Sequence, residues 1–442
     1  MNNLNFLVDV LKESPVFKTL EKNVKPGRTV CASGLSTINK SNIIYALCRL
    51  KGVTAFCLAS DEKEAQTLCN DLSCMGLRAY VYPVRDFNFL DFQSRSHEYE
   101  HARLKVLLKL INHECDVAIA CVDAAAQLTV PRNVLEQSVI EFEEGRELSL
   151  EKATKALTLL GYERFDAVEG SGQFSLRGGI LDFFMPDSDY PVRCEFWGDE
   201  ITDLSYFDIE TQRRFKKADK ITLSPSTEIV IEDRAALADK IEHKAKLLRS
   251  KNSAKAKEKL FSEAELIRSG AMIANADKFI NQIYDKPESL FDYLDRNTLV
   301  FASEFTAIQE RGKSMDFISN ETLMQGFEDG TLCRGFDRFA LTFNECTEFL
   351  QSHGTIVLEN FVHGSMPIKL SEIISFSTKQ LSAWGGSYKQ LKEDVDGLFT
   401  PESKGVIFAG TERAAKNLCD TFNADGINAV YSEGADKILS LI

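Results

Sequence analysis

The sequence contains no uninterrupted apolar run near the roughly 18 residues that would cross a bilayer. Its first residues are not typical of a secretory signal either, because Asp9, Lys12 and Glu13 interrupt the apolar segment that a signal requires. The 11 cysteines are an odd number and form no C-x-x-C pair, so no disulfide framework is indicated. Together these absences predict a cytoplasmic protein with no membrane partner.

Positive charge is also scarce, with 52 Lys and Arg against 66 Asp and Glu and a formal net charge of −14. An acidic chain has no overall attraction for nucleic acid, so any DNA contact would need a local basic patch. Lysines interleaved with glutamates more often form only a solvated helix face. One helical run offers a candidate patch, made of Lys240, Lys244, Lys246, Arg249, Lys251, Lys255, Lys257 and Lys259.

Neither internal repeats nor low-complexity tracts interrupt the chain, and 44% hydrophobic with 27% charged residues is typical of folded protein. Its 442 residues suggest about three domains. Near the amino terminus, short apolar strands alternate with amphipathic helices, which predicts βαβ units and a parallel sheet. The predicted strands are 29–33, 53–60, 79–84 and 115–122, and the predicted helices are 41–51, 62–75 and 98–112.

The pattern changes after residue 128. Val192, Cys194 and Phe196 recur with a period of two, which predicts antiparallel strands within 164–224, after one helix at 150–160. A lysine-rich helical segment follows. The later elements are predicted as helices in 232–284, strands at 299–303, 339–343 and 355–358, and a small closing α/β unit with strands at 373–377 and 405–409 and helices at 387–394 and 413–422.

A loop after the first strand has the outline of the phosphate-binding motif G-x-x-x-x-G-K-[ST]. The motif positions are occupied by Gly34, Asn39, Lys40 and Ser41. Asn39 replaces the second glycine, and the β-branched Thr37 and Ile38 disfavour the left-handed backbone that a phosphate nest needs. A working ATPase also needs an acidic pair after a neighbouring strand, where this chain has only Glu304. We therefore predict a degenerate loop that holds no nucleotide.

A second motif, His97-Glu98-Tyr99-Glu100-His101, matches H-E-x-x-H, in which two histidines one helical turn apart bind zinc. The match falls at the start of a helix after a polar run, where histidines are usually solvated. No further histidine ligand follows at the spacing that metalloproteases use. We predict that His97 and His101 hold no metal.

The third feature is a glycine-punctuated, aromatic-rich strand segment at 172–201. One reading makes it a β-meander whose aromatic residues are core. The other makes Arg164 and Arg177, beside an aromatic sheet, the centre of a protein-binding surface, because arginine and aromatic residues dominate such hot spots. The residue chemistry alone leaves both readings open.

The segment QFSLRGGILDFF…PVRCEFWGDEI…FDIETQRRF closely resembles a signature shared by the UvrB and transcription-repair coupling factor (Mfd) families. The resemblance extends over essentially the whole chain and is strong over 150–225. The coupling-factor family fits better, since the segment from Tyr82 to Phe87 leads almost directly to the helix at 98–112 and leaves no room for the DNA-inserting hairpin of UvrB. The degenerate loop and the tail beyond 365 agree with that choice.

The resemblance implies an α/β fold, in which a degenerate RecA/P-loop-like parallel-sheet domain (1–126 and 225–365) is split by an inserted α+β UvrB-type domain (127–224). A small α/β third domain (366–442) would follow. Full-length members of the family continue with RNA-polymerase-binding and helicase-motor domains, so the chain would be truncated at Ile442. ATP, Mg²⁺, RNA polymerase and DNA would belong to those further domains, which leaves this chain non-catalytic and without a cofactor.

The resemblance also implies a function: recruitment of UvrA to RNA polymerase stalled at DNA damage, for transcription-coupled nucleotide excision repair. A non-specific DNA-binding module and a UvrB-like or helicase-like ATPase stay open as alternatives. Ser175 stands where UvrB has a further arginine, so the interface could be shared differently here. The residues that we expect to contact UvrA are Arg164, Arg177, Phe174, Phe183 and Phe184.

Overall fold

The computed structural model describes residues 5–85, 97–138, 140–248, 254–270, 276–361, 366–378, 384–400, 405–407, 409 and 411–432. The predicted short connection through Phe87, and the predicted basic residues Arg249 and Lys251, lie outside these residues.

A seven-stranded sheet forms the largest domain, and every neighbouring pair of its strands is parallel. Most of its strands are buried along their whole length, as expected where helices cover both faces. The predicted α/β fold with a parallel sheet is confirmed. In spatial order the strands are β15 (Glu372–Ser375), β1 (Val30–Ser33), β14 (Thr355–Glu359), β13 (Leu299–Ser303), β2 (Ala55–Ala59), β4 (Val117–Cys121) and β3 (Ala79–Tyr82).

Helices on both faces of this sheet enclose two apolar cores, one per face. Alternate residues of one strand enter opposite cores: Phe56 and Leu58 pack in one, Cys57 in the other. The first core is covered by α5 (Glu98–Ile111), α6 (Val122–Ala126), α12 (Phe305–Asp329) and α13 (Phe343–His353). The second is covered by α1 (Asn5–Glu13), α2 (Pro15–Asn23), α3 (Thr37–Lys51) and α4 (Glu62–Cys74).

Three late segments differ from their predicted structure or placement. The predicted strand at 339–343 makes only an isolated bridge between Ala340 and Gln127, because Thr342 and Glu345 form a capping box that starts α13. The segment predicted as the first strand of the small third domain is β15, which pairs with β1 in the large sheet. Residues 405–407 and 409, predicted as a strand, have no strand structure.

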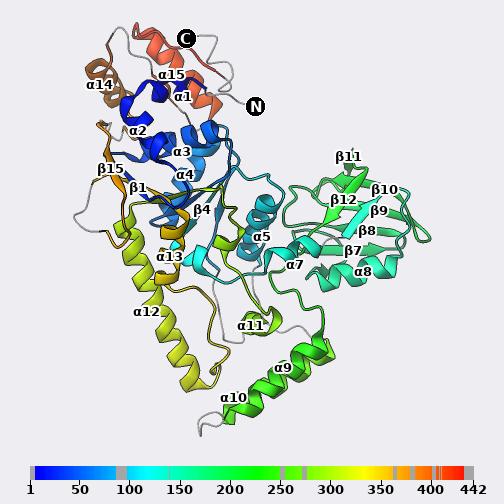
Figure 1. The fold of residues 1–442 in the computed structure, drawn as a ribbon. Helices are drawn as coiled ribbons and strands as arrows, with labels where there is room; N and C mark the ends of the chain where they lie inside the picture. Colours follow the sequence, from blue (N-terminus) through cyan, green and yellow to red (C-terminus); the bar gives the residue numbers. More distant parts are fainter. Residues whose placement is uncertain are drawn as a thin grey trace.

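The inserted domain lies beside the large sheet and contains its own six-stranded sheet (Figure 1). Its strands from β7 to β11 are antiparallel neighbours, which confirms the predicted meander, whereas β6 runs parallel to β7 at the edge. In spatial order the strands are β11 (Arg214–Lys217), β10 (Glu200–Phe207), β9 (Val192–Trp197), β8 (Ile180–Phe183), β7 (Gln173–Arg177) and β6 (Glu163–Arg164). The remaining elements are β5 (Ile140–Glu143), α8 (Leu150–Leu159) and β12 (Lys220–Leu223), whereas α7 (Arg132–Gln137), predicted as part of this domain, packs in the first core of the large domain through Leu135.

The lysine-rich segment forms a pair of helices that extends away from the large sheet (Figure 1). It has its own small apolar core, which includes Leu237, Ile241 and Leu260. No helix of the described residues is long and apolar enough to cross a membrane. The helices not yet named are α9 (Arg234–Leu247), α10 (Ala254–Ser269), η2 (Ala276–Phe279), α11 (Ile280–Ile283), η3 (Leu290–Tyr293), α14 (Tyr388–Leu398) and α15 (Glu412–Ala424).

Candidate functional site

The face of the six-stranded sheet that is turned away from its apolar core carries a row of polar residues. The strand register pairs Ser175 with Asp182, Asp182 with Arg193, and Arg193 with Ser205. The adjacent residues in each strand, such as Phe183, point to the other face and pack in the core with α8. The sheet therefore separates an apolar inner face from a polar outer face.

Two arginines meet on one buried carboxylate in this row. Asp182 is only 1% exposed, although it lies on the outer face. Arg193 binds both of its oxygens, with Nε 2.7 Å from Oδ1 and Nη2 2.8 Å from Oδ2. Arg177 donates from Nη2 to the same Oδ2 at 2.9 Å. The Arg193 guanidinium also lies 4.3 Å from the ring centre of Phe207, which fixes its plane.

The two arginines differ in how much of the side chain is exposed to a binding partner. The side chain of Arg193 is 13% exposed and that of Arg177 is 52% exposed. One carboxylate balances one guanidinium, so the cluster presents an excess positive charge, and Arg177 carries it to the surface. A guanidinium held at one nitrogen keeps further donors in a fixed fork for a partner's carboxylate.

A glycine turn brings Arg177 to the end of its strand. Gly178 has φ +62°, a left-handed conformation that favours glycine. A side chain on Gly179 would begin 2.8 Å from the carbonyl oxygen of Phe196, whose N–H donates to the Gly179 carbonyl at 2.8 Å. The two glycines are thus required by a tight turn that lies directly against β9.

Arg164 occupies the edge strand β6 and is exposed. Its register partner is Phe174, whereas Arg177 is three residues further along β7. Since side chains alternate between the two faces of a sheet, the two arginines belong to opposite faces. The hydroxyl of Ser175 donates to the carbonyl oxygen of Asp166 at 2.8 Å and ties the segment after Arg164 to β7. The described residues include no hydrogen-bond or ion-pair partner for the Arg164 side chain.

The structure corrects the assignment of two aromatic contact residues. Phe174 is 3% exposed and Phe183 is 0% exposed, so neither ring can meet a partner. The Phe183 ring packs 5.0 Å from that of Phe142 inside the core. Only Phe184 is partly exposed. This burial follows from the geometry of β7 and β8, because successive side chains of a strand point alternately to the core and to the outer face.

Sequence reasoning missed Asp182 and Arg193, which hold Arg177 in place. The available signal was the same period-two alternation, which puts both residues on the polar face of neighbouring strands. What the sequence could not show was the register that sets them opposite each other.

At the degenerate loop, α3 begins at Thr37, so the β-branched residues are helical instead of forming a phosphate nest. Gly34 is the loop residue with a left-handed backbone, and a Cβ there would lie 2.1 Å from the carbonyl oxygen of Phe376. Leu35 is 1% exposed and its N–H donates to the carbonyl of Glu359 at 3.0 Å. The backbone N–H groups of this short loop are therefore not collected around an open site.

The lysine of the loop is bound to carboxylates. Lys40 Nζ lies 2.6 Å from Oε1 of Glu304 and 3.4 Å from Oε1 of Glu64, and donates to Ser303 Oγ at 2.9 Å. Burial, followed by the nearby charge of Glu304, raises the pKa of Glu359 to about 7. Several acidic groups around a single lysine make a poor environment for a triphosphate, so the residues present do not fit ATP.

His97 and His101 belong to the contact between α5 and the inserted domain. Their rings stack 5.9 Å apart, and His97 Nδ1 lies 2.8 Å from Glu100 Oε2. A Cβ on Gly172 would lie 2.6 Å from Cε1 of His101, so this ring packs closely against the loop that precedes β7. Among the described residues, no group of three His, Cys, Asp or Glu side chains could hold a metal ion. The absence of zinc stays a prediction.

Glu100 should make the free energy of unfolding depend on pH in the acidic range. Burial acts to raise its pKa, but the hydrogen bond from His97 and the charge of Arg85 outweigh burial and lower the pKa from 4.5 to about 2. A carboxyl with a depressed folded pKa stabilises the fold above its unfolded pKa and loses that contribution as the pH falls toward the folded value. The wild type should therefore exceed Glu100→Gln in unfolding free energy at pH 7, and this difference should shrink between pH 5 and pH 3.

Urea unfolding of both proteins at pH 7, 5, 4 and 3 measures this effect. The matched control is Glu151→Gln, whose carboxyl is fully exposed in an i,i+4 pair with Lys155 and should change unfolding little at any of these values. A constant difference between wild type and Glu100→Gln across the series would contradict the assignment.

The predicted basic patch is partly neutralised. Lys246 pairs with Glu242 at 3.6 Å and Lys240 with Asp285 at 3.4 Å, and Arg268 of α10 pairs with both Glu242 and Asp239. Acidic side chains thus alternate with the lysines on α9 and α10. This arrangement favours a solvated helix pair over a continuous basic track for DNA.

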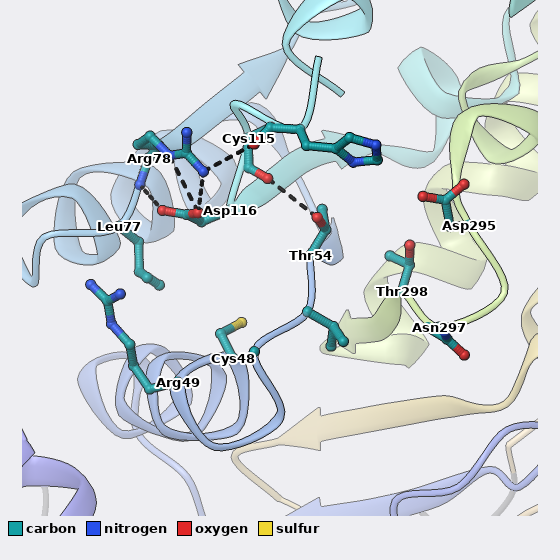
Figure 2. Close-up of a pocket in the computed structure, with 13 residues that line it drawn as sticks. Cys48, Arg49, Thr54, Leu77, Arg78, Cys115, Asp116, Asp295, Asn297 and Thr298 are labelled. Carbon is teal, nitrogen blue, oxygen red and sulfur yellow. Dashed lines mark hydrogen bonds and ion pairs between the residues drawn. The ribbon is translucent and has the colours of Figure 1, made fainter. Parts of the chain in front are cut away.

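A cavity of about 450 Å³ lies at the amino-terminal edge of the large sheet, and Figure 2 shows the residues that line it. Its charged groups largely satisfy one another: Arg78 pairs with Asp116 at 2.8 Å and donates to the carbonyl of His113, and Arg49 donates to the carbonyl of Gly76. Ligands of open parallel sheets bind at the opposite, carboxyl-terminal edge. We therefore assign this cavity no role in the site.

The inserted domain is similar to a known family of interaction domains. Residues 140–229 match the family model of the UvrB interaction domain, and they include Arg164, Arg177, Asp182 and Arg193. This confirms the resemblance that the R-G-G segment indicated. The matched region extends five residues beyond the predicted boundary at 224 and contains Glu228, which lies in the contact with the large domain.

Over nearly its whole length the chain is similar to transcription-repair-coupling factors. It is 26% identical over 428 residues to the factor of Bacillus subtilis (strain 168), which covers 94% of this chain and 36% of that protein. It is 24% identical over 364 residues to the factor of Staphylococcus epidermidis (strain ATCC 12228 / FDA PCI 1200), which covers 78% and 30%. The chain thus spans about a third of the length of the curated relatives it matches.

Proposed function

We propose that this chain is the UvrA-binding module of a transcription-repair coupling factor, and that it recruits UvrA to RNA polymerase stalled at DNA damage. The observation that carries the proposal is the half-exposed Arg177, held on the buried Asp182–Arg193 pair inside a UvrB interaction domain. Such a role would be carried out in the cytoplasm, where RNA polymerase acts.

The outer edge of the inserted sheet suits recognition of an acidic protein surface. Arg177 is preorganised by Asp182, so little side-chain freedom is lost when it pairs with a second carboxylate. Arg164, on the edge strand, offers a second guanidinium from the side of the sheet. Because the described residues place no further strand beyond β6, a partner can approach Arg164 along this edge, whereas Arg177 projects from the outer face of the sheet.

The proposal assigns no ATP chemistry to this chain. In the relatives, which are about three times longer, contacts with RNA polymerase and DNA and an ATP- and Mg²⁺-dependent motor would belong to other parts of the protein. Here the lysine of the phosphate loop is bound to Glu304 and Glu64. The module would then act by binding alone.

We expect immobilised chain to retain purified UvrA at micromolar concentration, and Arg164→Ala to retain clearly less. The matched control is Arg338→Ala, which removes a similarly exposed arginine outside the matched domain and should leave retention unchanged. Failure of the wild-type chain to retain UvrA, with circular dichroism showing a folded protein, would reject the proposed function.

We also expect no measurable ATP binding at millimolar nucleotide. Fluorescence titration with an ATP analogue should give the same flat response for the wild type and for Lys40→Ala, because this lysine is already paired with carboxylates. Saturable binding that is lost in Lys40→Ala would show that the loop is functional.

A further inference from the structure

Trp197 is the most exposed large hydrophobic side chain of the described residues, with 82% of its surface accessible. It is the last residue of β9 and stands next to the Gly198 turn that leads into β10. A single exposed hydrophobic residue is ordinary on a protein surface. What distinguishes Trp197 from such isolated residues is its position relative to Arg177.

The strand register puts Trp197 and Arg177 on the same face and at the same end of the sheet. Arg177 pairs with Ile180, and Ile180 pairs with Glu195. Trp197 is two residues beyond Glu195 on β9, so its side chain points to the same, outer face. The β7–β8 turn is bound to β9 through the N–H of Phe196 and the carbonyl of Gly179.

The surface between the two side chains is formed by the β7–β8 turn and by Ile180 and Glu195 of the same outer-face row. Gly178 and Gly179 have no side chains, and a Cβ on Gly178 would meet nothing within 4 Å. Glu195 and Asp203 are both paired with Arg214, whereas Glu200, the register partner of Trp197, is exposed. An exposed indole and an exposed guanidinium thus lie on one face and at one end of the sheet, with the glycine turn and the paired Glu195 between them.

We propose that Trp197 is a second anchor of the UvrA-binding surface, inserting its indole into an apolar recess of UvrA beside the carboxylate that Arg177 engages. This inference rests on the proposed function and names the chemistry that the partner must offer. Trp and Arg are the residues that most often dominate binding energy at protein interfaces. Trp also supplies a large contact area at a small cost in conformational entropy.

The first test is the affinity of the full chain for UvrA. Trp197→Ala should weaken binding by about 30-fold or more, as expected for loss of a central aromatic anchor. Trp197→Phe should retain most of the affinity, because a flat apolar ring remains. The matched control is Phe317→Ala on α12, a 63% exposed aromatic residue in the other domain, which should bind like the wild type.

Hydroxyl-radical footprinting with mass spectrometry gives a second readout. Oxidation of Trp197 should slow several-fold when UvrA is bound, and the chain's other tryptophan, Trp384, serves as the internal reference. If UvrA binds the wild type while Trp197→Ala keeps its affinity and Trp197 stays fully reactive, the anchor is refuted and the proposed function stands. If UvrA does not bind the wild type, both are refuted.

Discussion

Arg177→Glu should weaken UvrA binding by about 30-fold to several thousand-fold, because a partner carboxylate would be left buried against a like charge. Arg177 is the exposed member of the cluster on Asp182, so reversing its charge turns a positive site negative. Isothermal titration of UvrA with wild type, Arg177→Ala and Arg177→Glu measures the loss, and Arg177→Ala should fall between the other two.

A control for folding is needed, since Arg177→Glu would place a new carboxylate near Asp182. Circular dichroism and thermal unfolding must show that each variant keeps its structure. Arg338→Glu makes the same charge change on a similarly exposed arginine outside the matched domain, and should leave affinity unchanged. A folded Arg177→Glu that binds UvrA as tightly as the wild type would remove this arginine from the interface.

Arg103→Leu should cost about 3–5 kcal/mol of unfolding free energy, the usual penalty for breaking a buried ion pair from one side. Arg103 and Glu228 are both 0% exposed, with Nε 2.6 Å from Oε1. Arg103 also donates to Gln127 Oε1 at 2.8 Å, and its guanidinium lies 4.2 Å from the ring centre of Tyr82. The pair joins α5 to the last residues of the region that matches the UvrB interaction domain.

Chemical denaturation of Arg103→Leu, Glu228→Leu and the double variant tests this coupling. The double variant should be less destabilised than the sum of the single variants, because no uncompensated charge stays buried. Lys155→Ala breaks an exposed pair and should lower the unfolding free energy far less than Arg103→Leu does. A loss below about 1 kcal/mol in Arg103→Leu would show that the buried pair does not stabilise the fold.

The parallel sheet could be predicted because its strands are short, apolar and separated by amphipathic helices. The meander could be predicted because alternation in 192–197 is a local signal. The pairing of β15 with β1 could not be predicted, since these strands are more than 340 residues apart in the chain. Thr342 misled the strand prediction at 339–343, because its side chain caps a helix that only the tertiary structure completes.

At the candidate site, the sequence identified the two exposed arginines but not their support. Asp182 and Arg193 come together through strand register, and Phe174 and Phe183 are buried by the same alternation. At the phosphate loop, the sequence predicted degeneracy from missing glycines. The structure adds that Lys40 is held by Glu64 and Glu304, which come from distant segments of the chain.

The most direct test of the central claim is competition between this chain and UvrB for UvrA. Labelled chain is bound to UvrA, purified UvrB is added, and the fraction of chain still bound is followed by fluorescence anisotropy. If the inserted domain presents the surface by which UvrB contacts UvrA, saturating UvrB should release the chain completely. A ternary complex of the chain, UvrA and UvrB that persists at saturating UvrB would contradict the account.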